Sequence, residues 1–154
     1  MKQYLFVLVL GIGFTGCISG GTHGYIKGYH YNVTKDKLDK AVHQIIAGSL
    51  TIIRDSVNTY YNDSTNYISL GIIEKELPYT YVFRYYGGKE YWDTSKVSEI
   101  FIAYAYDKNR KGGSSGNGGI KWYDFNLKRN LTEPFEHEFI YKIDSLLGIK
   151  HVEE

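Results

Sequence analysis

Two segments of the chain place apolar residues three and four positions apart, which is the spacing of an amphipathic helix. In the first segment, residues 34–48, the apolar positions are Leu38, Ala41, Val42, Ile45 and Ile46. Thr34 can accept hydrogen bonds from the first-turn amides, and Gly48 suits the left-handed residue that ends many helices. This pattern predicts a helix with both ends marked in the sequence.

The second helical pattern lies near the end of the chain, at residues 132–148, and its apolar stripe is Phe135, Phe139, Ile143, Leu146 and Leu147. Thr132 fits the N-cap, and Pro134 falls in the first turn, where a missing N–H group does no harm. Gly148 fits the C-terminal stop. We therefore predict a C-terminal helix that begins at Thr132.

Between these helices the pattern changes to that of strands. The segments rich in β-branched and aromatic residues are 67–74, 79–86, 99–106 and 120–127, with weaker candidates at 25–31 and 50–53. Turn residues separate them, at 58–66, 74–78, 92–95 and 107–119. Short connections favour antiparallel neighbours. We predict an α+β fold: an antiparallel meander sheet of four or five strands, with the N-terminal and the C-terminal helix packed on one face.

Alternation along the strands predicts which side chains share a face of the sheet. In 79–86 one face receives Tyr79, Tyr81, Phe83 and Tyr85. In 99–106 the small Ala103 and Ala105 would let a helix approach closely, so we expect both under the helices. The opposite face would then carry Ile100, Ile102, Tyr104 and Tyr106.

Tyrosine is the unusual feature of the composition, with 16 residues in the chain. Tyrosine and tryptophan offer a large contact area at low entropic cost, so they are favoured on recognition surfaces. The candidate binding surface is the sheet face without helices, and its residues are Tyr104, Tyr106, Trp122, Tyr123 and Arg84. The alternative is that these rings only complete a two-sided sheet.

The start of the chain carries an apolar run, residues 4–14, that is about half the length of a membrane-spanning helix, which needs roughly 20 apolar residues. Lys2 precedes the run, and small residues follow it. This is the layout of a secretory signal peptide, and it predicts export and removal of the segment. The alternative is a core strand or helix.

The run ends in Phe14-Thr15-Gly16-Cys17, which contains the only cysteine of the chain. This stretch resembles the lipobox of bacterial lipoprotein precursors. The resemblance covers about the first 20 residues and implies removal of residues 1–16 and acylation of Cys17. Ile18-Ser19, with no Asp after the cysteine, implies attachment to the outer rather than the inner membrane, while the side that the domain faces stays open.

After residue 16, the chain divides into a tether and one domain. Residues 17–30 contain several glycines and suit a flexible tether, and residues 31–154 have the size of a single α+β domain. The formal net charge of the whole chain is +1, and loss of Lys2 brings it to zero. This balance argues against a nucleic-acid partner. Without a second cysteine, the mature domain forms no internal disulfide.

The sequence contains no strong catalytic or metal-binding motif. The five histidines, His23, His30, His43, His137 and His151, lack metal-ligand spacing, and the pair Glu133 and His137 lacks a third ligand. Ser114 and Ser115 lie in a glycine-rich loop that does not lead into a helix as a phosphate loop would. We therefore expect no metal and no cofactor.

Two functions from different classes fit these observations. The first is a lipid-anchored cell-envelope protein whose noncatalytic domain binds a protein, peptide or glycan, as an inhibitor, immunity factor or assembly accessory. The second is a small envelope hydrolase that uses acidic residues such as Glu99 and Asp107. That reaction requires two carboxylates roughly 5 to 10 Å apart in one cleft.

Overall fold

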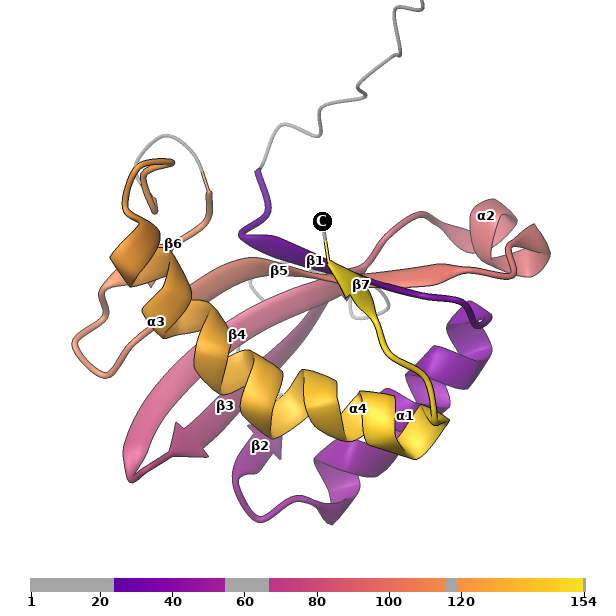
Figure 1. The fold of residues 1–154 in the computed structure, drawn as a ribbon, viewed down its shortest axis with the longest axis horizontal. Coiled ribbons are helices and arrows are strands. Elements are labelled where there is room, and N and C mark those ends of the chain that lie inside the picture. Colours follow the sequence, from indigo (N-terminus) through magenta and orange to yellow (C-terminus); the bar gives the residue numbers. More distant parts are fainter. Residues whose placement is uncertain (1–23, 55–66, 116–118, 154) are drawn as a thin grey trace, which may run out of the picture.

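A computed structural model describes residues 24–54, 67–115 and 119–153. The chain folds into one antiparallel sheet with the N-terminal and the C-terminal helices on one face, so the predicted α+β class is confirmed (Figure 1). The described residues form seven strands, more than the four or five expected, because short strands are added at the edges of the sheet. The strands are β1 (Lys27–Tyr31), β2 (Ile52–Arg54), β3 (Tyr67–Glu74), β4 (Leu77–Tyr85), β5 (Ser98–Tyr106), β6 (Gly112–Gly113) and β7 (Val152–Glu153). The helices are α1 (Lys35–Gly48), α2 (Lys89–Thr94), α3 (Phe125–Phe135) and α4 (Tyr141–Leu147), with a π-helical turn (Glu136–Ile140) between the last two. The lipobox with Cys17 and the expected turn at 58–66 lie outside the described residues.

The sheet has the order β2-β3-β4-β5-β1-β7, and β6 pairs with β5. Strands β3, β4 and β5 form three strands of the predicted meander, and β2, from the weaker candidate at 50–53, extends it by pairing with β3. The first strand of the chain, β1, pairs with the other side of β5, and the short β7 pairs with β1. The sheet therefore begins at Lys27, within the segment expected to be tether. The connection from β4 to β5, expected as turns, contains the short helix α2.

Helix α1 lies where the sequence predicts it. The Thr34 hydroxyl accepts a hydrogen bond from the amide of Lys37 at 3.4 Å, as expected of an N-cap. The end of α1 differs from the prediction, because Gly48 is the last helical residue and Ser49 follows it in an extended conformation with φ −93°. The expectation of a left-handed Gly48 was wrong, since the chain continues directly toward β2 without reversing through a left-handed residue.

The C-terminal helical segment begins earlier than Thr132, and the expected strand at 120–127 was wrong. Asp124 is the N-cap of α3, and its Oδ1 accepts a hydrogen bond from the Leu127 amide at 3.1 Å. Leu127, Leu131 and Phe135 then recur at helical spacing, and this overrides the local strand preference of the aromatic residues. Pro134 thus lies inside α3, not in its first turn. The predicted stop is confirmed, because Gly148 is left-handed with φ 68°.

A β-bulge decides which side chains of β5 face the helices. Phe83 pairs with Ile102 and Val82 pairs with Tyr104, so Ala103 is an extra residue in β5. The extra residue reverses the alternation at that point. Ile102 therefore faces the helices, although we expected it on the opposite face.

The same bulge corrects the other face assignments of β5. The residues that face the helices are Ile100, Ile102 and Ala105, whereas Glu99, Phe101, Tyr104 and Tyr106 lie on the opposite face. Ala105 pairs with Tyr81, whose hydroxyl donates to the Leu131 carbonyl of α3 at 2.8 Å, so the prediction for Ala105 is confirmed. Ala103 does not share that face, and Ile100 was assigned to the wrong one. A bulge is invisible to simple alternation.

The core between sheet and helices is unusually rich in aromatic rings. Phe135 of α3 lies against Tyr29, Tyr81 and Phe83, with ring centroids 6.0, 5.0 and 5.9 Å away. All four side chains are fully buried. The hydroxyls of Tyr29, Tyr81 and Tyr85 find partners, as in the 2.8 Å bond from Tyr85 to Asp39 Oδ1 of α1. Most of the tyrosines on the helix side of the sheet therefore stabilise the domain.

Candidate functional site

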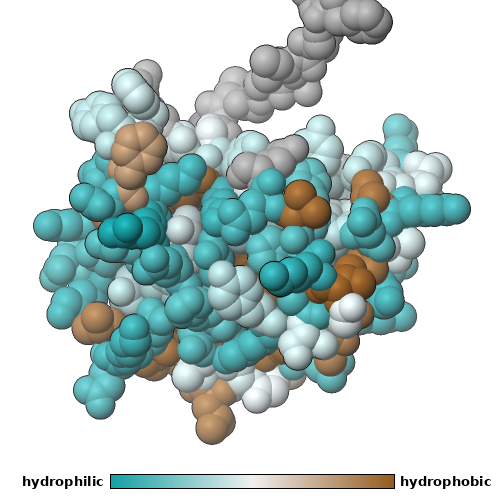
Figure 2. Space-filling view, in the orientation of Figure 1, coloured by the Kyte–Doolittle hydropathy of each residue, from teal (hydrophilic) through white to brown (hydrophobic). Residues whose placement is uncertain are grey.

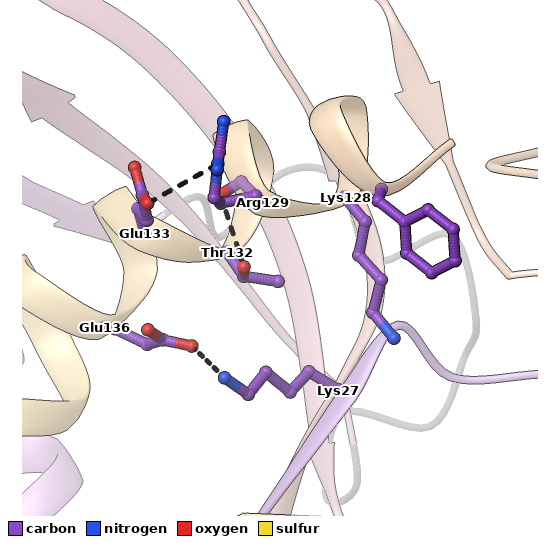
Figure 3. Close-up of a pocket in the computed structure, with 7 residues that line it drawn as sticks. Lys27, Lys128, Arg129, Thr132, Glu133 and Glu136 are labelled. Atoms are coloured by element: carbon purple, nitrogen blue, oxygen red, sulfur yellow. Dashed lines mark hydrogen bonds and ion pairs between the residues drawn. The ribbon is translucent and has the colours of Figure 1, made fainter. Parts of the chain in front are cut away.

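A groove of about 390 Å³ runs between α3 and β1 (Figure 3). It is lined by Lys27, Phe125, Lys128, Arg129, Thr132, Glu133 and Glu136. All but Lys27 project from successive turns of α3 and the start of the π-helical turn. At 1.5 Å per residue these positions span roughly 16 Å along the helix. The groove is therefore an elongated, charged surface.

An ion pair forms the inner end of the groove. Lys27 lies on the helix side of β1, and its Nζ is 2.6 Å from Oε1 of Glu136 (Figure 3). The Tyr29 hydroxyl donates to the same oxygen at 3.0 Å. Burial alone would lower the pKa of Lys27, but its hydrogen bonds to Glu136 and Glu153 raise it above the usual value. Burial beside Glu136 raises the pKa of Tyr29 far above its usual range, which keeps the phenol a donor.

This ion pair continues into a polar network beneath the C-terminus. Lys27 Nζ is also 3.0 Å from Glu153 of β7. His151 Nδ1 is 2.9 Å from Asp144 of α4, and its Nε2 is 3.7 Å from Glu153. The hydrogen bond from Lys27 lowers the pKa of Glu153. The network links β1, β7 and α4, so Lys27 and Glu136 are held in fixed positions.

The outer part of the groove carries two further cations. Arg129 is 3.8 Å from Glu133 on the exposed surface of α3, which is a weak pair. Lys128 points into the space between α3 and β1 (Figure 3) and, among the described residues, has no ion-pair partner. Uncompensated positive charge beside Phe125 gives the groove the character of a site for an acidic group attached to an apolar body.

An aromatic turn, defined as Trp122, Tyr123 and Phe125, borders the outer end of the groove. The exposed fractions of these three side chains are 83%, 61% and 69%. The rings of Trp122 and Tyr123 meet edge to face, with centroids 5.6 Å apart. Pale and brown side chains gather over the start of α3 in the surface view, whereas hydrophilic side chains cover most of the remaining helix side (Figure 2). Such clustering of exposed rings indicates a contact surface.

The structure divides the sequence-predicted binding residues into two groups. Trp122 and Tyr123 belong to the aromatic turn, whereas Tyr104, Tyr106 and Arg84 lie on the sheet face opposite the helices, where both tyrosines are half-buried.

Arg84 is part of a stack across that sheet face. Its guanidinium carbon lies 5.2 Å from the ring centroid of Tyr67 and 4.9 Å from that of Phe101. Its Nη1 also donates to the Tyr67 hydroxyl at 2.8 Å. These ring contacts and the hydrogen bond hold the guanidinium against both rings, so Arg84 ties β3, β4 and β5 together.

The two carboxylates of the hydrolase hypothesis lie far apart. Glu99 and Asp107 are eight residues apart along and just beyond β5, a separation of roughly 26 Å at strand geometry. Glu99 is buried, with Oε2 3.7 Å from His30. Asp107 Oδ1 accepts hydrogen bonds from the amides of Asn109 and Lys111, both at 2.8 Å. These two residues do not form the carboxylate pair that the hypothesis requires.

No group of three or more potential metal-ligating side chains occurs within residues 24–54, 67–115 and 119–153. In the same ranges, no helix is long and apolar enough to cross a membrane.

Sequence reasoning missed the groove. Lys27 lies in a strand that was predicted only weakly, and no role was predicted for Glu136. One signal was available: Lys27 shares its strand face with Tyr29 and Tyr31, so a cation is placed in an otherwise aromatic row. Because burying an unpaired charge is costly, a lysine in such a row indicates an acidic partner nearby.

Comparison with known proteins gives no further assignment. No protein family, curated protein or solved structure matches this chain.

Proposed function

We propose that this chain is a lipid-anchored protein of the cell envelope, held at Cys17, whose folded domain is a noncatalytic binding module. The anchor rests on the lipobox-like Phe14-Thr15-Gly16-Cys17, and attachment to the outer membrane is favoured by Ile18-Ser19. Two or more acyl chains on one cysteine give stable membrane attachment, whereas a single chain binds only marginally.

The observation that carries the binding role is the α3–β1 groove, which the exposed Phe125 lines at its outer end. Lys128 has no ion-pair partner within the described part of the chain, and Phe125 provides an exposed apolar surface beside it. The chemistry fits an acidic group on a protein, peptide or glycan of the envelope. The fixed pair of Lys27 and Glu136 supplies a donor and an acceptor at the inner end, which suits recognition of an extended polar ligand.

Photocrosslinking in cells tests this proposal. A photoreactive phenylalanine derivative replaces Lys128 in the full chain, and the same derivative at Lys40, on the exposed side of α1, is the matched control. We expect a discrete adduct from position 128 and none from position 40. The adduct should fractionate with envelope membranes and should leave the membrane fraction when Cys17→Ala is added.

The outcomes separate the two parts of the proposal. Equal labelling from positions 128 and 40 would contradict a binding site in the groove. Adducts that fractionate identically with and without Cys17 would contradict the anchor. Arg129→Glu serves as a second probe of the groove, since reversal of an exposed charge should weaken the adduct without affecting folding.

A further inference from the structure

The aromatic turn exposes three large rings in four residues, 122 to 125. Trp122, Tyr123 and Phe125 are all more than half exposed. Rings with a polar edge, such as indole and phenol, prefer the boundary between water and hydrocarbon. A surface of this kind is matched by the headgroup region of a bilayer, where one side of each ring is apolar and the other is wet.

The turn is held on a rigid frame. The amide of Asp124 donates to the Lys121 carbonyl at 3.0 Å, and the Lys128 amide donates to the Asp124 carbonyl at the same distance. Ile120, directly before the turn, is buried, and its amide donates to the Ser114 carbonyl at 2.8 Å. The rings therefore project from a fixed edge of the domain and can enter an interface at little entropic cost.

The described chain starts beside this turn. Gly24 forms an antiparallel bridge with Ser115, and Ser115 forms a parallel bridge with Ile120. Neighbouring strands lie about 4.8 Å apart, so Gly24 and Ile120 are roughly 10 Å from each other. Figure 1 likewise places the first described residues and the start of α3 near the same end of β1.

Covalent geometry limits how far this edge can lie from Cys17. Seven peptide units connect Cys17 to Gly24, and at about 3.5 Å per residue they reach at most roughly 25 Å. An acylated Cys17 lies in the bilayer interface. The aromatic turn is thus close to the point from which the domain is suspended.

The charges around the turn complement an anionic membrane surface. Between residues 107 and 129 the basic residues are Lys108, Arg110, Lys111, Lys121, Lys128 and Arg129, and the acidic ones are Asp107 and Asp124. Both acids are engaged with backbone amides, in the β5–β6 turn and at the N-cap of α3. Basic side chains beside a lipid anchor strengthen binding to anionic headgroups.

We infer that the aromatic turn is a membrane-docking edge, through which the domain rests on the anionic phospholipid surface that holds its anchor. This inference rests on the anchor proposed above and adds an orientation to it. Trp122 and Tyr123 enter the headgroup region, and Lys121 lies over the phosphates. The groove then runs away from the membrane along α3, with the pair of Lys27 and Glu136 farthest from the lipid.

The two tryptophans of the chain allow a direct test with an internal control. Trp92→Phe leaves Trp122 as the single indole, whereas Trp122→Phe leaves Trp92 in α2, at the other end of β5. Each variant is expressed as the full chain, and its acylated product is placed in vesicles of phosphatidylethanolamine and phosphatidylglycerol with brominated acyl chains. Because an indole at the interface meets the quencher, we expect a roughly two-fold or greater loss of Trp122 fluorescence and almost none for Trp92. Flotation of the same samples reports the anchor.

The outcomes distinguish the docking edge from the anchor. Protein that floats with the vesicles while Trp122 and Trp92 are equally unquenched overturns the docking edge and leaves the anchor intact. Protein that does not float overturns both. Replacement of phosphatidylglycerol by phosphatidylcholine should reduce the quenching of Trp122, and quenching independent of lipid charge would contradict the role of the basic residues. Circular dichroism checks that Trp92→Phe, which removes a 2.7 Å bond to the Tyr86 carbonyl, leaves the fold intact.

Discussion

The protein has two groups of aromatic side chains, one beneath the helices and one in the aromatic turn. Both contain tyrosine, but the first group is buried and the second is exposed. Tyr29 and Tyr81 are completely buried, with hydroxyls bonded to Glu136 and to the Leu131 carbonyl. Trp122 and Tyr123 are mostly exposed. The comparison teaches that abundance of tyrosine does not by itself indicate a recognition surface. Position relative to the helices separates stabilising rings from those available for contact.

Alkaline pH should produce the largest effect, because it destabilises the fold through the buried tyrosines and not through the exposed ones. Burial raises the pKa values of Tyr29, Tyr31, Tyr81 and Tyr85 well above 10.0, the ordinary value of the unfolded chain. Above pH 10 the unfolded state therefore loses protons that the folded state keeps, so stability is present below pH 10 and is lost as pH rises. Above pH 10 each of these tyrosines lowers the free energy of unfolding by about 1.4 kcal/mol per pH unit. The four together lower it by roughly 5 kcal/mol per pH unit.

Ultraviolet absorbance of tyrosinate and circular dichroism, recorded in one titration, check this prediction. The buried tyrosines should ionise only together with the loss of secondary structure. Smooth ionisation of all tyrosines in a protein that stays folded would contradict their burial.

The next effect is that of a cavity in the aromatic core. Phe135→Ala removes the ring that contacts Tyr29, Tyr81 and Phe83, and we expect the free energy of unfolding to fall by about 3–5 kcal/mol. Urea unfolding followed by circular dichroism measures the change. Phe125→Ala is the matched control on the same helix, and an equal loss for both variants would contradict the division into buried and exposed rings.

A smaller effect is expected at the inner end of the groove. Glu136→Ala leaves Lys27 and the Tyr29 hydroxyl without their shared acceptor, and should lower the free energy of unfolding by about 2–3 kcal/mol. Addition of Lys27→Met should recover part of the loss, because it removes a charge that is left with only the half-exposed Glu153 as its partner. Urea unfolding measures the stability of both single variants and of the double variant. If the loss in the double variant equals the sum of the two single losses, the two residues do not act as a pair.

The smallest effect on stability is expected at the aromatic turn. Trp122→Ala should change the free energy of unfolding by less than about 0.5 kcal/mol, because the indole contacts little of the folded protein. Thermal unfolding measures it. A loss comparable to that of Phe135→Ala would mean that Trp122 supports the core and is not reserved for contact.

Periodicity predicted much of the fold. The α1 boundaries, the strands β3 to β5 and the left-handed Gly148 follow from the spacing of apolar residues and from turn chemistry. The start of α3 was missed because Lys121-Trp122-Tyr123 has the composition of a strand, while the capping role of Asp124 depends on the helix that follows. The bulge at Ala103 was missed because it depends on the register between two strands.

The candidate site was less accessible to sequence reasoning. Trp122 and Tyr123 are exposed, as predicted. They belong to a capped turn, however, and not to the sheet face on which the sequence analysis placed them. Lys27 and Glu136 are 109 positions apart, and only the packing of α3 on β1 brings them together. Long-range pairs of this kind cannot be deduced from local spacing.

The docking edge depends on the proposed attachment of the chain to lipid through Cys17. Intact mass and detergent phase partitioning of the protein made in a bacterial host, compared with Cys17→Ala, test it most directly. We expect a product that has lost residues 1–16, has gained the mass of acyl chains, and enters the detergent phase only when Cys17 is present. An unmodified, full-length product that stays in the aqueous phase in both cases would contradict it.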